Sequence, residues 1–245
     1  MKSFLAAMAF LTRLPVGRLV TFDAADVADS AGWFPVIGLL LGTLYAAAAT
    51  LLRSHLPPGI IAVLLVTLDA LATGALHFDG LADSADGFGG GKTREDTLRI
   101  MRDHAIGSYG GLALAALVAL KVMAYSALLK QSDWIPALIL APALGRWSIL
   151  LLTATLPYAR PSASAIEGMG KGSLIWGTGV IVIAMIAASS LRAAIALAVV
   201  VGATAAFGLY CRHRIGGITG DTLGANLQLC ESAALLTFLW TAYKQ

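Results

Sequence analysis

Long apolar segments dominate this chain and restrict what it can fold into. A helix that crosses a lipid bilayer needs about 20 largely apolar residues. Of the 245 residues, 58% are apolar and only 13% are charged, whereas ordinary soluble domains are about 25% charged. We therefore expect an all-α, polytopic membrane bundle that forms one domain over residues 1–245. The sequence predicts seven transmembrane helices, at 32–52, 58–77, 108–129, 134–156, 173–190, 192–210 and 223–243.

The same composition excludes other classes of protein. The apolar content is too high for a disordered chain. Two cysteines, Cys211 and Cys230, are too few for a disulfide framework, and we expect free thiols. The net charge of +3 gives no indication of a nucleic-acid partner.

The N-terminal segment predicts a helix that lies in the membrane interface. Phe4, Leu5, Met8 and Leu11 fall on one helical face within residues 1–14. A short helix of this kind contacts membrane lipid along its apolar side. We predict no signal peptide, because no small-residue cleavage site precedes a hydrophilic region.

The charged residues are distributed unevenly between the two sides of the membrane. With the N-terminus in the cytoplasm, eleven of the 17 Lys and Arg residues lie in cytoplasmic segments, as the positive-inside rule requires. Eleven of the 14 acidic residues lie there too, and Asp133 alone lies on the other side. The rule does not explain the acids. They indicate a functional site that faces the cytoplasm, unless the outer loops are simply too short to carry charge.

Three aspartates stand close together in the longest polar segment, at 77–104. Asp79, Asp83 and Asp86 have the spacing i, i+4, i+7, so they share one face if the preceding span continues as a helix. No basic residue nearby in the sequence neutralises them, and carboxylate oxygens favour Mg²⁺. The segment 77–107 therefore predicts a Mg²⁺-assisted phosphoryl-transfer site. The simpler alternative is a solvated helix end with Asp-Gly turns.

A short amphipathic helix is predicted to follow on the cytoplasmic side, with Thr93 as its N-cap. Arg99 and Arg102 lie on one of its faces, and guanidinium groups bind phosphate with two parallel hydrogen bonds. The alternative for Arg99 is a weak pair with Glu95 within the helix.

Several other charged residues carry open alternatives. Asp221 is a metal or hydroxyl ligand, or the N-cap of the last helix. Arg146 lies inside a span, where a charge is costly, so it is functional or pairs with Asp69 or Glu231. Lys121 is expected to extend its long side chain toward the interface.

Five runs of residues together resemble the cobalamin synthase family, also called the adenosylcobinamide-GDP ribazoletransferases. The pattern H-x-D-G-x-x-D-x-x-D-G, followed by R-D-H-x-x-G-x-x-G, is specific in combination. The resemblance covers nearly the whole chain. The five runs are FLTRLP (10–15), GALHFDGLADSADGFGG (74–90), RIMRDHAIGSYG (99–110), ALGRW (143–147) and GGITGDTLGA (216–225).

The resemblance implies a Mg²⁺-dependent enzyme of the bacterial inner membrane. It would join adenosylcobinamide-GDP to α-ribazole, or to α-ribazole 5′-phosphate, and release GMP. Asp79, Asp83 and Asp86 would hold the metal. In the alternative, one of these carboxylates, Asp86 or Asp83, would accept the proton of the attacking hydroxyl instead of binding the metal. The residues expected to bind substrate are His77, Arg99, Arg102, Asp103, His104, Arg146, Arg160 and Asp221.

Two other functions are compatible with the pattern. One is a phosphotransferase that acts on CDP-alcohol lipids, whose aspartate spacing is different. The other is a cation-coupled transporter with Asp69, Arg146 and Glu231 at the midplane, although no internal repeat is evident. Gly38 and Gly42 allow close helix packing, either within one chain or between copies in a homo-oligomer.

Overall fold

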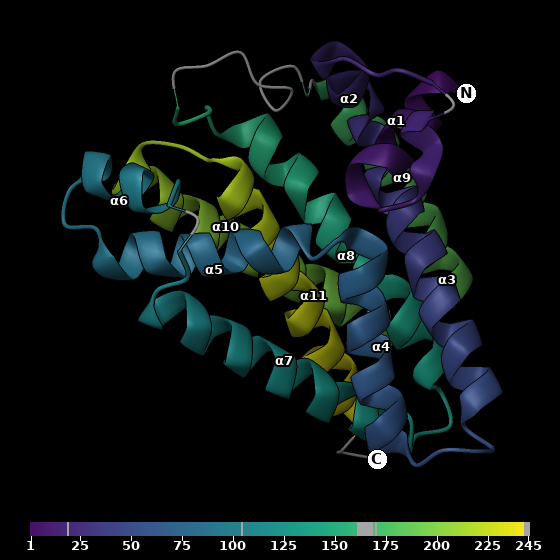
Figure 1. Ribbon diagram of the computed structural model, residues 1–245. Coiled ribbons are helices and arrows are strands. Elements are labelled where there is room, and N and C mark those ends of the chain that lie inside the picture. The colour runs from purple at the N-terminus through teal and green to yellow at the C-terminus, as the bar shows by residue number, and fades with distance from the viewer. Residues whose placement is uncertain (19, 104, 161–168, 170, 243–245) are drawn as a thin grey trace.

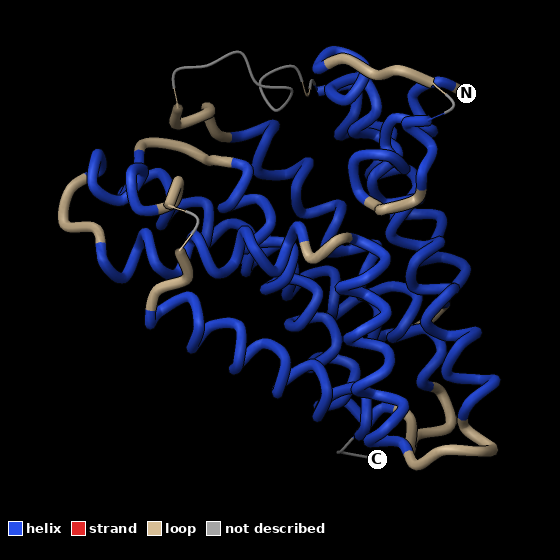
Figure 2. Tube along the Cα trace, viewed as in Figure 1, coloured by secondary structure: helices blue, strands red, loops and turns tan. Residues whose placement is uncertain are grey.

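The computed structural model describes the whole chain except residues 19, 104, 161–168, 170 and 243–245 (Figure 1). Within the described residues the chain is built from helices, and no strand occurs beyond an isolated parallel bridge between Tyr158 and Ile218 (Figure 2). The helices are α1 Lys2–Leu11, η1 Pro15–Arg18, α2 Ala24–Ser30, η2 Ala31–Trp33, α3 Phe34–Leu52, α4 Pro58–Thr73, α5 Leu76–Gly90, α6 Arg94–Ile100, α7 Ser108–Leu128, α8 Trp134–Thr155, α9 Lys171–Ala188, α10 Leu191–Ile215 and α11 Gly220–Ala242.

The all-α multi-pass architecture is confirmed, with fewer full-length spans than the sequence predicts. Four described segments are long and apolar enough to cross a membrane: Ala24–Leu52, Ser108–Leu128, Trp134–Thr155 and Leu191–Ile215. The bent pair of α4 and α5 is a fifth candidate. α9 is a shorter apolar helix, and polar residues along α11 lower its hydropathy.

α8 is the central helix of the bundle. In its apolar window 78% of the residues are buried, against 28% in α7 and in α10, so α8 is surrounded by protein. α3 packs closely along α8, because a Cβ on Gly38 would lie 2.5 Å from the Ala143 Cα and one on Gly42 would lie 2.6 Å from the Ile139 Cα. This glycine pair therefore serves packing within one chain.

The second span, expected at 58–77, does not continue straight into the acidic segment, although the three aspartates still share one helix. α4 ends at Gly74, whose φ of +65° is left-handed, and the Ala75 N–H closes the turn on the Ala70 carbonyl at 2.7 Å. This is the helix-ending geometry that glycine favours. The chain then bends by 92° into α5, which crosses the bundle beside α7 and α11 (Figure 1). The aspartates thus lie beyond the bend, on the half of this pair that crosses the bundle.

The N-terminal helix forms as predicted, over Lys2–Leu11. Ala6, Ala7 and Leu11 are buried against the rest of the chain, and Lys2 pairs with Asp26 of α2 at 2.8 Å. Its depth in the membrane interface stays a prediction.

Candidate active site

Two glycines bring α5 and α11 into close contact. A Cβ on Gly80 would lie 2.8 Å from the carbonyl oxygen of Asp221, and one on Gly224 would lie 3.3 Å from the Cα of His77. No larger side chain fits between the helices at this distance. The crossing therefore places Asp221, at the start of α11, beside the aspartates of α5.

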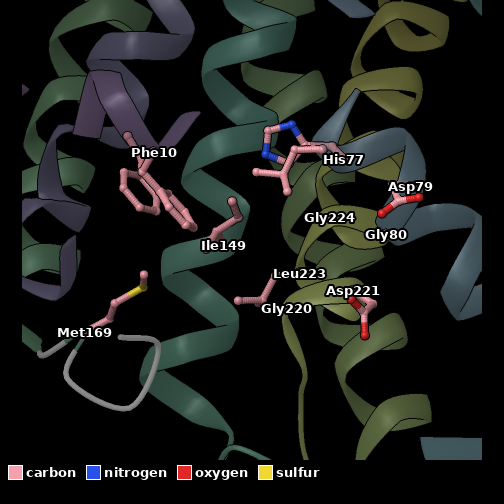
Figure 3. A pocket seen from close by; sticks show the side chains of 12 residues that line it. Phe10, His77, Asp79, Gly80, Ile149, Met169, Gly220, Asp221, Leu223 and Gly224 are labelled. Carbon is pink, nitrogen blue, oxygen red and sulfur yellow. The ribbon is translucent and has the colours of Figure 1, made fainter. Parts of the chain in front are cut away.

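A cavity of about 260 Å³ opens at this crossing. Figure 3 shows the carboxylates of Asp79 and Asp221 on one side of it and apolar side chains opposite. The His77 ring also lines the cavity, and its buried Nδ1 has no hydrogen-bond partner among the described residues. The remaining lining residues are Phe10, Phe34, Leu76, Gly80, Ile149, Met169, Gly220, Leu223 and Gly224.

Asp83 lies one turn after Asp79 and is half-buried. The pKa of the Asp83 carboxyl is raised to about 6, first by burial and then by the neighbouring carboxylates of Asp79, Asp221 and Asp86, while Arg160 opposes them. The cluster therefore holds more negative charge than its one nearby guanidinium offsets. Such a surplus favours a bound cation or a shared proton.

Asp86 has a different environment, although it lies on the same stripe of α5. Its Oδ2 accepts the backbone N–H of Gly107 at 2.7 Å, and its Oδ1 accepts that of Gly110 at 2.8 Å. Asp86 thereby caps the N-terminus of α7, where backbone N–H groups lack helical partners. The expectation of three open carboxylates on one face is corrected, because the start of α7 covers the third.

Arg160 pairs with Asp221, its Nη2 donating to Oδ2 at 2.7 Å. The backbone sets this contact, since the Ala159 N–H donates to the Ile218 carbonyl at 2.8 Å and the Ile218 N–H donates to the Pro157 carbonyl at 2.9 Å. The sequence indicated Arg160 and Asp221 as two independent site residues and did not predict that they pair. The bridge that joins their loops appears only in the tertiary structure.

Arg99 on α6 and Arg102 in the turn after it lie near the other end of α5. α6 packs where a Cβ on Gly87 would meet Met101, two turns beyond Asp79. Arg99 is largely exposed and lies 3.7 Å from Asp96, rather than beside Glu95. Arg102 and Asp103 are exposed, and His104 lies outside the described residues. The structure does not bring this predicted set into the cavity, so its phosphate role stays a prediction.

Arg146 belongs to an internal network instead of the cavity. Its Nη1 donates to Glu231 Oε2 at 3.0 Å, and Lys121 Nζ donates to Glu231 Oε1 at 2.9 Å and to Asp69 Oδ2 at 3.0 Å. Tyr45 donates to Asp69 Oδ1 at 2.9 Å. The pairing expected for Arg146 is present, whereas the substrate contact is not seen. Lys121 does not extend toward the interface, because it is fully buried between two carboxylates.

The comparison with protein families fits this arrangement. The model of CobS, cobalamin-5-phosphate synthase, matches residues 3–239. The chain belongs to this family. Three similar proteins are named adenosylcobinamide-GDP ribazoletransferase. The one from Syntrophobacter fumaroxidans is 37% identical over 234 residues, covering 93% of this chain and 94% of the relative.

The other two relatives are matched over a similar length. That from Ralstonia nicotianae is 37% identical over 248 residues, which is 98% of this chain and 96% of the relative. That from Shewanella putrefaciens is 36% identical over 248 residues, with 96% and 93% covered. No solved structure matches the chain.

In this member of the cobalamin-5-phosphate synthase family, the carboxylates at the cavity suit a cation such as Mg²⁺ that takes few ligands from the protein. No group of three His, Cys, Asp or Glu side chains in the described part of the chain is arranged to hold a metal by itself. Mg²⁺ does not need such a cage, because it binds one or two carboxylates and keeps water or substrate phosphate in its other positions. Asp79 and Asp221 line the cavity from α5 and α11, and they would be the donor set for such an ion.

Sequence reasoning missed the apolar half of the site. Phe34 and Ile149 look like ordinary membrane-helix residues, and although Phe10 and Leu223 lie in two of the runs that carry the resemblance, no spacing showed that they line a cavity. The one available signal was Gly224, which lies in the same short run as Asp221 and marks the close contact of α11 with α5. Its role is close packing rather than chain flexibility.

Proposed function

We propose that this chain is an adenosylcobinamide-GDP ribazoletransferase. It joins adenosylcobinamide-GDP to α-ribazole or its 5′-phosphate and releases GMP, giving adenosylcobalamin or its 5′-phosphate. The observation that carries the mechanism is that Asp79 of α5 and Asp221 of α11 lie on the same side of the cavity, with Asp83 near them. The chain is also similar to ribazoletransferases over 93% of its length.

The reaction forms one P–O bond and breaks another. The ribose 3′-hydroxyl of the ribazole attacks the phosphorus linked to cobinamide, and GMP leaves with the other phosphate. Asp79 and Asp221 would hold Mg²⁺, which supplies charge stabilisation for the diphosphate when bound. Asp83 accepts the hydroxyl proton, since a carboxyl with a pKa of about 6 is a suitable base near neutral pH.

Arg160 has two roles in this proposal. Its Nη2 holds Asp221 in place, and its Nε is buried without a partner among the described residues, so a shift of the side chain would let Nε donate to an incoming phosphate oxygen. Arg99 on α6 and Arg102 just after it would contact the more distant phosphate or ribose of the GDP group.

The decisive measurement is GMP release by the purified, detergent-solubilised protein. The assay contains adenosylcobinamide-GDP, α-ribazole 5′-phosphate and Mg²⁺, with EDTA and no-ribazole controls. We expect GMP and a corrinoid of the joined mass, both dependent on metal and ribazole. Folded protein that releases no GMP under these conditions overturns the proposal.

We also propose that the protein lies in the bacterial inner membrane with the active site and the N-terminus on the cytoplasmic side. The asymmetric charge distribution supports this orientation. Both native thiols are buried, so a Lys92→Cys variant introduces one exposed thiol on the α5–α6 loop. A membrane-impermeant maleimide should label it in inside-out vesicles and leave it unlabelled in right-side-out vesicles. The reverse pattern would invert the assignment.

A further inference from the structure

The apolar half of the active-site cavity has a shape and chemistry that the transfer reaction does not by itself explain. Phe10 of α1 and Phe34 of α3 stack with ring centroids 5.7 Å apart and planes at 17°. Ile149 of α8 and Leu223 of α11 complete the wall. Phe10 and Ile149 lie across the cavity from Asp79 and Asp221, whereas Leu223 comes from α11, the helix that also carries Asp221 (Figure 3).

We propose that this wall binds the aromatic base of α-ribazole, so that the cavity is the acceptor-nucleoside subsite. The inference rests on the proposed function and names the part of the substrate that the cavity takes. The base is a dimethylated benzimidazole, a flat, apolar two-ring system. Aromatic and aliphatic side chains bind such a ring by burial and stacking.

Size and polarity select this group among the parts of the two substrates. Pockets for drug-sized ligands measure about 300–1,000 Å³, and this one, of about 260 Å³, fits a nucleoside base but not a corrin macrocycle. Guanine carries several donors and acceptors that must be paired when buried. The side chains opposite the carboxylates have no groups to pair them.

His77 provides the one polar contact that the base requires. Its side chain is 3% exposed, lines the cavity and leaves Nδ1 without a partner among the described residues. A buried polar atom without a partner is costly. When the base binds, a turn of the ring would present the Nδ1–H to the free imidazole nitrogen of the base, which accepts one hydrogen bond.

The placement also explains how the hydroxyl is presented. Asp79 and Asp221 line the same cavity as the apolar wall. A base held against Phe10 and Ile149 leaves its ribose on the side of α5 and α11. The attacking hydroxyl then lies next to the carboxylates, which is the positioning that a transfer between two large substrates needs.

The test narrows the cavity and compares two acceptors. In Ile149→Phe the larger ring occupies space at the wall, and the matched control Leu151→Phe makes the same class of change on α8 at a second cavity, between α8 and α10. Each protein is assayed with α-ribazole and with the nucleoside that lacks both methyl groups. KM for adenosylcobinamide-GDP is measured in parallel.

We expect Ile149→Phe to raise KM for α-ribazole at least tenfold and to raise it less for the unmethylated nucleoside, since each methylene-sized change in a pocket alters discrimination by roughly 10–200-fold. KM for adenosylcobinamide-GDP should stay within twofold. Leu151→Phe should resemble the wild type. A KM for α-ribazole that is unchanged, or equal losses with both acceptors, overturns the inference.

A second variant keeps the test informative if Ile149→Phe does not fold. Phe10 is 39% exposed, so Phe10→Ala is expected to fold, to raise KM for α-ribazole and to improve the relative use of nucleosides with bulkier bases. A Phe10→Ala protein with wild-type preference and a reduced content of bound phospholipid would show that lipid occupies the wall. Wild-type protein that releases no GMP would instead mean that the proposed function has failed.

Discussion

Asp79, Asp83 and Asp86 lie on one stripe of α5, and their neighbours give each a different environment. Asp79 is exposed at the cavity, Asp83 is half-buried among carboxylates, and Asp86 is covered by the start of α7. The ionisation and the available lone pairs of a carboxylate depend on these surroundings more than on the residue type. The three residues should therefore respond differently to the same substitution.

Asp83→Asn should lower turnover about 10²–10⁴-fold, the range of general-base contributions, while the Mg²⁺ concentration for half-maximal activity stays within threefold. Asp79→Asn is the matched variant one turn away, and it should raise that Mg²⁺ requirement. Initial rates of GMP release measured over a range of Mg²⁺ concentrations distinguish a loss of turnover from a higher Mg²⁺ requirement. If both variants change only the Mg²⁺ requirement, Asp83 is a metal ligand and not the base.

The pH dependence follows from the raised pKa of Asp83, about 6. A base works only when deprotonated, so turnover should fall as pH drops through about 6, or somewhat lower with Mg²⁺ bound. The stability of the fold changes with pH in the opposite direction to turnover. Because the pKa of Asp83 in the folded protein is raised above 3.8, this carboxyl stabilises the folded protein at low pH, and that contribution is lost as the pH rises through about 6. Asp83→Asn should therefore raise the Tm of the metal-free protein at pH 7.5. An unchanged Tm would contradict the electrostatic account.

Asp86→Asn should destabilise the protein without changing its Mg²⁺ requirement. The amide offers one acceptor atom to two backbone N–H donors, and a hydrogen bond to a charged group contributes about 1.5–3 kcal/mol. Thermal unfolding in detergent measures the loss, with Asp103→Asn, on the exposed loop, as the control. A normal Tm combined with a raised Mg²⁺ requirement would restore Asp86 to the metal site.

Among the helices, the contact between α5 and α11 decides whether the site exists. The 92° bend after α4 turns the acidic helix across the bundle, and Gly80 and Gly224 then allow the close approach that brings Asp221 into range. Neither feature involves a reacting group. Activity should consequently be sensitive to small changes in the spacing of two helices.

Gly80→Ala should cost activity more than Gly224→Ala does. The added Cβ at Gly80 meets backbone atoms of Asp221 at 2.8 Å, whereas the nearest atom at Gly224 is 3.3 Å away. Backbone cannot rotate aside, so α11 must move, at a cost of roughly 1–3 kcal/mol. Initial rates and Tm are compared with those of Gly202→Ala on α10, where nothing lies within 4 Å. Equal behaviour of all three variants would show that the crossing is not tightly packed.

Across the whole molecule, a buried charge network connects five helices. Tyr45 of α3, Asp69 of α4, Lys121 of α7, Arg146 of α8 and Glu231 of α11 join two cations to two anions, far from water. A cluster with equal numbers of opposite charges can be tolerated inside a bundle, but a single unpaired charge is costly. The network therefore ties α3, α8 and α11, which line the cavity, to α4 and α7, which do not.

Lys121→Met should destabilise the protein by about 3–5 kcal/mol, because it leaves two facing carboxylates with one guanidinium. The double variant Lys121→Met with Glu231→Gln removes one charge of each sign and should recover part of the loss. Unfolding in detergent is compared with that of Lys130→Met, whose side chain is exposed. A double variant less stable than Lys121→Met would argue against charge balance as the cause.

The sequence by itself determined the membrane class, the helical architecture, the family resemblance and most of the acidic cluster. These properties depend on local hydropathy and on short motifs, which are written in consecutive residues. Asp79, Asp83 and Asp221 were all identified this way. The pairing of Arg146 with Asp69 and Glu231 was also accessible, because a charge inside a span requires a partner.

The tertiary structure alone decided how those pieces combine. The turn at Gly74, the capping of α7 by Asp86, the burial of Lys121 and the convergence of Phe10, Phe34, Ile149 and Leu223 on one cavity all involve residues far apart in the chain. Every apolar residue in a membrane helix satisfies the same local pattern, whether it faces lipid, the core or a substrate. Only the packing of one helix against another distinguishes these positions, since that packing depends on distances that no single segment contains.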